Sequence, residues 1–179
     1  MATQSTYDQP LTGIPTVDAL IFGAAWKLGT DGALTYSFGG HESLWPDYGI
    51  GSEPGTGFAP LAGIAQQAVR DALSSWSSVA NLQFQEVVDD ASGCGTLRIA
   101  YTTLGMDATQ LAYSYAPADS ANGGDVWLNA QLQDSLYASF SAGGLSSYVV
   151  LHEMGHGLGL KHPHAASSLN SATLFSDTF

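Results

Sequence analysis

The stretch over residues 152–162, which reads HEMGHGLGLKH, constrains this chain more than any other feature of its sequence. His152 and His156 are four residues apart, so on an α-helix both imidazoles lie on one face, at a span that a single metal ion can bridge. Glu153 lies about 100° round the helix from His152, and it can reach a metal-bound water without being a ligand. The pattern therefore predicts a helix that carries two metal ligands and a carboxylate beside them.

A third histidine completes the set only if the helix ends before it. His162 follows His156 by six residues, about 240° further round a continuous helix, and would point away from the metal. Gly159 can adopt the left-handed conformation that ends a helix, and Pro163 prevents the helix from continuing. We expect the chain to swing His162 back to the same ion. Three neutral imidazoles with an open fourth position are typical of a catalytic zinc site, so zinc is the expected cofactor.

The rest of the sequence predicts an α+β domain with two helices against one sheet. Apolar residues recur at helical spacing from Leu61 to Ala80, where Pro60 is expected in the first turn, and again over residues 145–158. Residues 17–26 are expected to form a helix or an arm on the core, and residues 41–58 a long Gly-rich loop. Alternating or β-rich segments predict strands over residues 33–38, 82–88, 97–101, 111–115 and 126–129.

Charge and composition exclude several classes of function. The 179 residues include 16 Asp and Glu but only 4 Lys and Arg, a formal net charge of -12. Four scattered cations cannot form the basic stripe that nucleic acid requires or dock on anionic lipid. No apolar run approaches the length of a membrane span. The single cysteine, Cys94, rules out an internal disulfide framework and a cysteine-based zinc site.

The spacing HExxHxxGxxH is the signature of the metzincin metallopeptidases. The form HGLGLKHP resembles the serralysin branch, which are secreted bacterial zinc endopeptidases. The segments VDALIFGAAW, LTYSF, ALSSWSSVANLQFQEV and GGDVWLN are similar to that branch too, so the resemblance covers about residues 14–163.

The resemblance implies a function, a site and a sheet. It makes His152, His156 and His162 the zinc ligands and Glu153 the general base, which assists a zinc-activated water in hydrolysing peptide bonds of polypeptide substrates. It also implies a zincin-like fold, with a twisted mixed sheet of about five strands that has an antiparallel edge strand and packs on two long helices. Substrate peptides would pair with that edge strand, where Ala112 and Tyr113 are the candidate contacts.

Two departures from the family pattern shape the expected domain organisation. Metzincins have a methionine-containing turn after the third histidine, whereas no methionine follows His162 here. The Gly-rich calcium-binding repeats of serralysins are also missing, so calcium binding stays open with no site identified. We expect one catalytic domain over residues 1–179, cut before the Met-turn, with an N-terminal subdomain over about 14–159 and a stub of the C-terminal subdomain over 160–179. We further expect the isolated chain to be a poor peptidase.

Alternatives to an active endopeptidase remain. The chain could be a catalytically incomplete zinc-binding fragment or an interaction domain, with a C-terminal fragment or a protein inhibitor as its partner. A non-peptidase hydrolase could use the same zinc-water chemistry. The resemblance implies secretion, and the polar N-terminus lacks the basic start and apolar stretch of a signal peptide.

Overall fold

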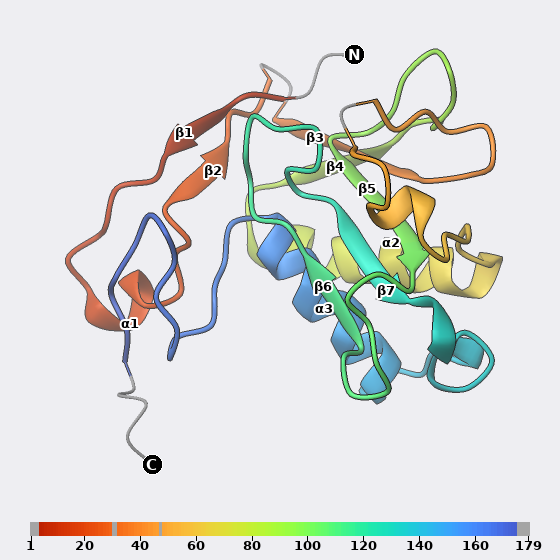
Figure 1. Cartoon of the computed structure of the whole chain (residues 1–179). Coiled ribbons are helices and arrows are strands. Elements are labelled where there is room, and N and C mark those ends of the chain that lie inside the picture. The colour runs from red at the N-terminus through yellow and green to blue at the C-terminus, as the bar shows by residue number, and fades with distance from the viewer. Residues whose placement is uncertain (1–3, 30–31, 47, 175–179) are drawn as a thin grey trace.

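A five-stranded mixed sheet organises the computed structural model, which describes residues 4–29, 32–46 and 48–174. The strand order is β4-β3-β5-β7-β6; β6 is antiparallel to β7, and all other neighbouring strands are parallel (Figure 1). The strands are β3 (Ala33–Phe38), β4 (Gln83–Glu86), β5 (Leu97–Thr102), β6 (Ala112–Ser114) and β7 (Val126–Asn129). The antiparallel strand β6 lies at the edge of the sheet.

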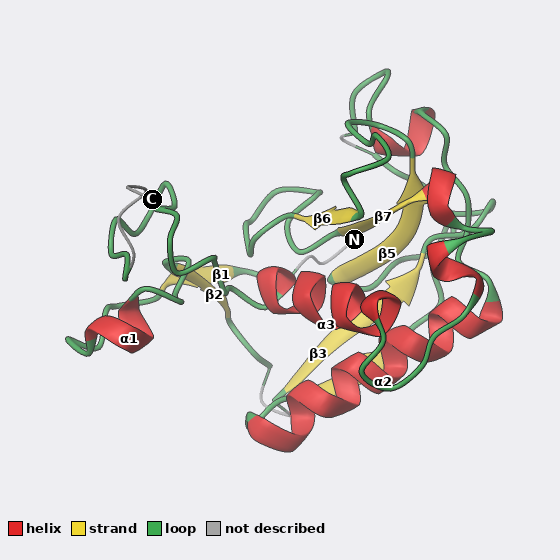
Figure 2. Ribbon diagram, turned by 90° about the horizontal axis from the view of Figure 1, so that it is seen from below, coloured by secondary structure: helices red, strands yellow, loops and turns green. Residues whose placement is uncertain are grey.

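Two long helices, α2 (Gly63–Val79) and α3 (Leu145–Gly157), cover the same face of this sheet, as Figure 2 shows. Their apolar residues pack against the central strands, of which β5 is buried along its whole length. Short 3-10 turns lie in the connections at Glu53–Gly55 (η1), Ala130–Leu132 (η2) and Leu136–Ala138 (η3). The expected fold class, a mixed sheet with an antiparallel edge strand against two long helices, is confirmed.

The start of α2 differs from the expectation. The helix begins at Gly63, so Pro60 precedes it and is not in its first turn. The reason is a tertiary contact: Ala59 forms an antiparallel bridge with Tyr101, and the two residues exchange main-chain hydrogen bonds of 3.2 and 2.9 Å. This bridge holds the chain extended at the place where proline alone favours a helix.

The N-terminal segment forms a separate ribbon beside the sheet. It contains β1 (Thr6–Asp8), the one-turn helix α1 (Pro15–Asp18) and β2 (Ala24–Trp26), and β1 pairs antiparallel with β2. In place of one helix or arm over residues 17–26, the chain turns after Asp18 and enters a strand. The carboxylate of Asp18 accepts hydrogen bonds from Thr12 and Gly13, which fixes this turn.

The segment that follows α3 runs back along this ribbon, at the left of Figure 1. The two ends of the described chain therefore pack on one another, although they are far apart in the sequence. Residues 1–3 and 175–179, which the domain prediction includes, lie outside the described residues. Within the described part, no helix combines the length and the apolar character needed to cross a bilayer.

Candidate metal centre

Helix α3 presents the first two histidines of the motif as the spacing predicts. His152 and His156 project from successive turns of the same face, and their Nε2 atoms are 3.0 Å apart. The opposite side of the helix is anchored in the core by residues such as Val150 and Met154, both fully buried. Because the helix is packed along its inner face, the two imidazoles start from a rigid support.

The end of α3 is a Schellman motif centred on Gly159. The N–H of Leu160 donates to the carbonyl of Gly155 at 3.0 Å, and the N–H of Gly159 donates to that of His156 at 2.9 Å. Gly159 has a φ of 106°, in the region that side chains disfavour, and a Cβ there would lie 2.7 Å from the carbonyl oxygen of Ala24. The sequence prediction that glycine ends the helix here is confirmed.

This sharp turn returns His162 to the other two histidines. Its Nε2 atom lies 2.9 Å from that of His152 and 3.2 Å from that of His156. Zn–N bonds of about 2.0–2.1 Å at tetrahedral angles place ligand nitrogens roughly 3.3–3.4 Å apart, so the observed spacing is close to a zinc site. The donor set therefore fits zinc, and the three histidines can hold one metal ion.

The protonation of the cluster also suits a metal. The Nδ1 atom of His156 lies 2.9 Å from the carbonyl oxygen of Leu160, which can only accept a hydrogen bond. Nδ1 must therefore carry the proton, leaving the Nε2 lone pair free for a metal. Burial, followed by the neighbouring imidazoles, lowers the pKa of His152 and of His162, which favours the neutral form that binds metal.

Glu153 lies at the same level of α3 and is almost completely buried, with 8% of its surface exposed. Burial raises the pKa of its carboxyl group to about 7. It lines the same hollow as His156 and His162 and is not a member of the nitrogen cluster.

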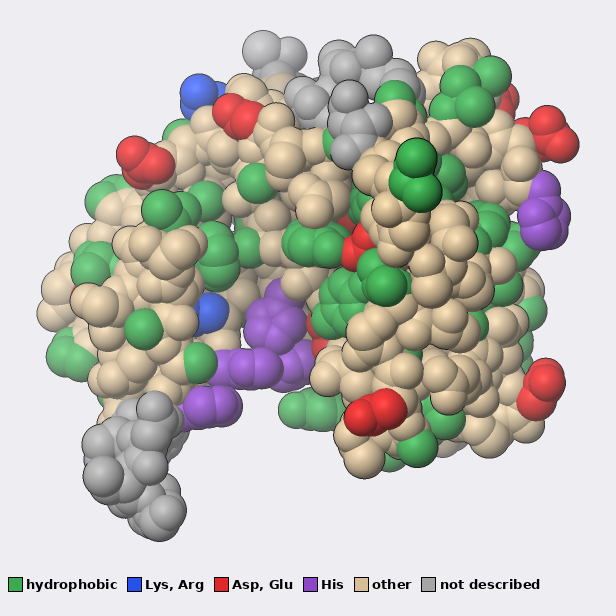
Figure 3. Space-filling view, in the orientation of Figure 1, with side chains coloured by type: hydrophobic (Ala, Val, Ile, Leu, Met, Phe, Trp, Pro, Cys, Tyr) green, Lys and Arg blue, Asp and Glu red, His purple; other side chains and the backbone are tan. Residues whose placement is uncertain are grey.

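That hollow has a volume of about 380 Å³ and lies between the edge strand and the segment after α3. In Figure 3 a group of histidine side chains gathers at the notch between the N-terminal part and the sheet, while one further histidine stands apart at the right. One wall is formed by residues around β6, and the other by residues 160–167 together with Phe22. Phe22 had no signal in the sequence, because it reaches the hollow only through the packing of the chain ends.

The edge strand presents alternate residues to its free side. The N–H of Tyr115 donates to the main-chain carbonyl of Asp125, and the N–H of Asn129 donates to that of Leu111. By alternation, the main-chain groups of Tyr113 are directed toward β7. The main-chain groups of Ala112 and Ser114 consequently face the open edge. Of the two candidate contacts, Ala112 is thus placed for main-chain pairing, whereas Tyr113 is not.

The side chain of Gln110 already occupies part of this edge. Its Nε2 atom donates to the carbonyl oxygen of Ala112 at 2.5 Å. Gln110 lines the hollow, and nothing in the sequence pattern singled it out.

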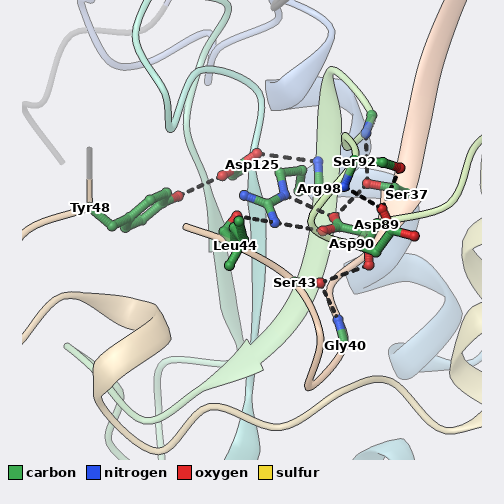
Figure 4. Close-up of polar contacts among 11 residues, drawn as sticks. Ser37, Gly40, Ser43, Leu44, Tyr48, Asp89, Asp90, Ser92, Arg98 and Asp125 are labelled. Carbon is green, nitrogen blue, oxygen red and sulfur yellow. Dashed lines mark hydrogen bonds and ion pairs between the residues drawn. The ribbon is translucent and has the colours of Figure 1, made fainter. Parts of the chain in front are cut away.

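A second polar cluster lies on the face of the sheet opposite the helices (Figure 4). Arg98 is ion-paired with Asp89 at 2.7 Å, both side chains being almost fully buried, and its guanidinium stacks 3.4 Å from the ring centroid of Trp45. Beside it, Asp125 accepts from Tyr48 at 2.5 Å and from the N–H of Arg98 at 3.2 Å. These contacts hold Trp45 and Tyr48, from the predicted loop, on the sheet.

The fold and the three-histidine centre together define a metzincin-type domain. A sequence model of the matrixin family matches residues 61–177, more than half of the chain. The chain therefore belongs to the matrixin family.

Individual relatives agree with the serralysin resemblance. The chain is 28% identical over 163 residues to a serralysin of Photorhabdus sp. (strain Az29), covering 81% of this chain and 30% of that protein. It is 29% identical over 150 residues to serralysin C of Dickeya chrysanthemi, covering 83% and 30%, and 32% identical over 159 residues to metallopeptidase AprA of Pseudomonas marginalis, covering 81% and 31%. The chain spans about 30% of the length of these relatives.

Proposed function

We propose that this chain is the catalytic domain of a zinc-dependent endopeptidase. The observation that carries the proposal is the convergence of three imidazole nitrogens within 3.2 Å of one another, at a hollow that the buried Glu153 also lines. We assign His152, His156 and His162 as the zinc ligands. The likeness to serralysins supports polypeptide substrates and a place of action outside the cell.

When bound, zinc supplies a Lewis acid that polarises a carbonyl group and lowers the pKa of a coordinated water to about 7. Glu153 takes the proton from the attacking water and later delivers it to the leaving amine. Its raised pKa, about 7, suits both halves of this exchange because the group can hold and release a proton near neutral pH.

The edge strand holds the substrate. An extended peptide pairs with the free main-chain groups of Ala112 and Ser114, and its scissile bond then lies in the hollow beside the histidines. Tyr113 contributes through its inward pairing with Trp127, which keeps the strand in register.

The test is the variant Glu153→Gln, assayed in the full-length protein. It should bind zinc as the wild type does, but its cleavage of casein should fall by about 10²–10⁴-fold, since the general base is lost. Gln133→Ala, a change in the 3-10 region outside the hollow, serves as the control. Near wild-type turnover by Glu153→Gln would contradict the mechanism.

A second candidate is a zinc-dependent hydrolase that does not act on peptides. The same three-histidine centre supports it, because the chemistry of a zinc-activated water would be common to both. Hydrolysis of simple esters without any cleavage of casein, both abolished by a zinc chelator, would favour this alternative.

A further inference from the structure

His162 differs from the other two histidines in what supports it. His152 and His156 are carried by a packed helix, whereas His162 lies beyond the helix end and is exposed. Within the described residues, the hydrogen-bond-range contacts of its imidazole are with the other two histidines. Its ring also stacks on that of His164, with centroids 5.2 Å apart, and both residues are carried by the same backbone after the helix. The course of this backbone therefore sets the place of His162 in the cluster.

That backbone is joined to the N-terminal segment by main-chain hydrogen bonds. The N–H of Phe22 donates to the carbonyl of Gly159, and the N–H of Lys161 donates to that of Leu20, both at 2.8 Å. These bonds lie on either side of an isolated antiparallel bridge between Ile21 and Leu160. The residues immediately before His162 are thus paired with a segment about 140 positions earlier in the chain.

The side chain of Lys161 adds a connection of a different kind. It is 93% buried, and its ammonium donates to three main-chain carbonyl oxygens, of Ala19 at 2.8 Å, Ala165 at 2.9 Å and Ala172 at 2.7 Å. Among the described residues, no carboxylate lies within ion-pair distance of it. All three of its donors are used, so one side chain ties together the N-terminal segment and two points of the segment that follows His162.

Asn170 reinforces the same junction. Its Nδ2 atom donates to the carbonyl oxygens of Asp18 at 2.7 Å and Ile21 at 2.5 Å, while its Oδ1 atom accepts from the N–H of Ala172 at 2.8 Å. Asn170 is buried, with 4% of its surface exposed. A side chain eight residues after His162 therefore forms hydrogen bonds with the same N-terminal turn to which Lys161 is bonded.

We propose that Lys161 is a positioning residue for the metal centre. Its ammonium group, together with the side chain of Asn170, holds the backbone of His162 against residues 18–22 of the N-terminal segment. The inference rests on the proposed function only in taking the three histidines as metal ligands. Without the ammonium, His152 and His156 stay in place on α3, but the turn that brings His162 to them is held to the N-terminal segment by fewer hydrogen bonds, chiefly its two main-chain ones. The expected consequence is a weakened metal site that keeps two of its three ligands in position.

The test measures Co²⁺ binding, because cobalt occupies histidine sites and its visible absorption reports coordination geometry. Lys161→Met keeps the length of the side chain but removes all three donors. Its Co²⁺ affinity should fall by about 10–100-fold, as for other supports of metal ligands, and its visible band should lose intensity as water replaces His162. Lys161→Arg, which keeps a cationic donor, should bind Co²⁺ more tightly than Lys161→Met and recover the band.

The matched control is Lys27→Met, which removes the same charge from an exposed site; its Co²⁺ affinity should be that of the wild type. A folded Lys161→Met with wild-type affinity and spectrum would overturn the proposal, as would equal losses in Lys161→Met and Lys161→Arg. Should Lys161→Met not fold, Asn170→Ala decides: weaker Co²⁺ binding supports the junction, and wild-type affinity refutes it. Because no arm measures peptide cleavage, an inactive protein that binds Co²⁺ through His162 would disprove the proposed function and leave this inference standing.

Discussion

The imidazole of His156 has a defined role for each of its nitrogens. Nδ1 donates to Leu160, and Nε2 faces the nitrogens of His152 and His162. The sequence predicted the ligand set but could not predict this tautomer, because the accepting carbonyl reaches Nδ1 only once Gly159 has turned the chain. The same holds for Glu153, whose burial, and hence whose raised pKa, depends on packing that the motif does not encode.

Asp125 provides a pH prediction that is independent of the metal. Burial raises its pKa to about 7, against the opposing effects of the Tyr48 hydrogen bond and the charge of Arg98. Between about pH 3.8, the pKa of this group in the unfolded chain, and about pH 7, the carboxyl group of Asp125 is therefore protonated in the folded protein but ionised in the unfolded chain. The stabilisation from this carboxyl is complete below the unfolded pKa and is lost as the pH rises through the folded one.

The measurement compares the wild type with Asp125→Asn, which is neutral at every pH. Relative to Asp125→Asn, the free energy of unfolding of the wild type should fall by roughly 1.4 kcal/mol per pH unit between about pH 4 and 7, and then level off. Urea unfolding at about pH 5 and pH 7.5 gives the difference, and the pH dependence of zinc binding cancels between the two proteins. A constant difference across this range would show that Asp125 titrates with an ordinary pKa.

Helix α3 and the edge strand β6 show how far elements could be predicted. The strand over residues 126–129 (β7) and the start of α3 at Leu145 agree with the sequence predictions. The strand is a short apolar run that is buried on both faces, and the helix is the one that the histidine spacing requires. The short strand β1 carries no such pattern: its burial is slight, and its partner β2 defines it. Likewise, the residues of β6 that face the open edge follow from its register with β7, which local sequence does not specify.

Gln110 leads to a prediction about β6. Its side-chain amide donates a hydrogen bond to the carbonyl oxygen of Ala112, an acceptor that a substrate N–H would otherwise use. Removing it in Gln110→Ala frees this acceptor, so KM for an extended peptide should fall by about 2–10-fold with little change in kcat, in line with one net hydrogen bond. Steady-state kinetics would check this, with the exposed Gln67→Ala as the control. A raised KM would instead show that Gln110 supports the strand or contacts the substrate.

On the scale of the whole molecule, the sequence predicted least where the two ends of the described chain meet. That residues 160–179 are a stub of a C-terminal subdomain stays a prediction. In the structure, the start of this segment packs on the N-terminal ribbon and lines the hollow with Phe22. Contacts such as the hydrogen bond from Lys161 to Ala19 span 142 positions, so no local sequence pattern could predict them. Whether the isolated chain cleaves peptides stays a prediction.

The most direct test of the account is the zinc content of the purified protein and of its single histidine variants. The wild type should carry about one zinc per chain at neutral pH, and His152→Ala, His156→Ala and His162→Ala should each lose most of it, since a three-ligand site cannot spare one. His164→Ala is the matched control: its ring stacks on His162 with centroids 5.2 Å apart, but it is outside the ligand cluster, so it should keep the metal. Full zinc in His156→Ala, or loss of zinc in His164→Ala alone, would contradict the three-histidine centre on which the proposed function depends.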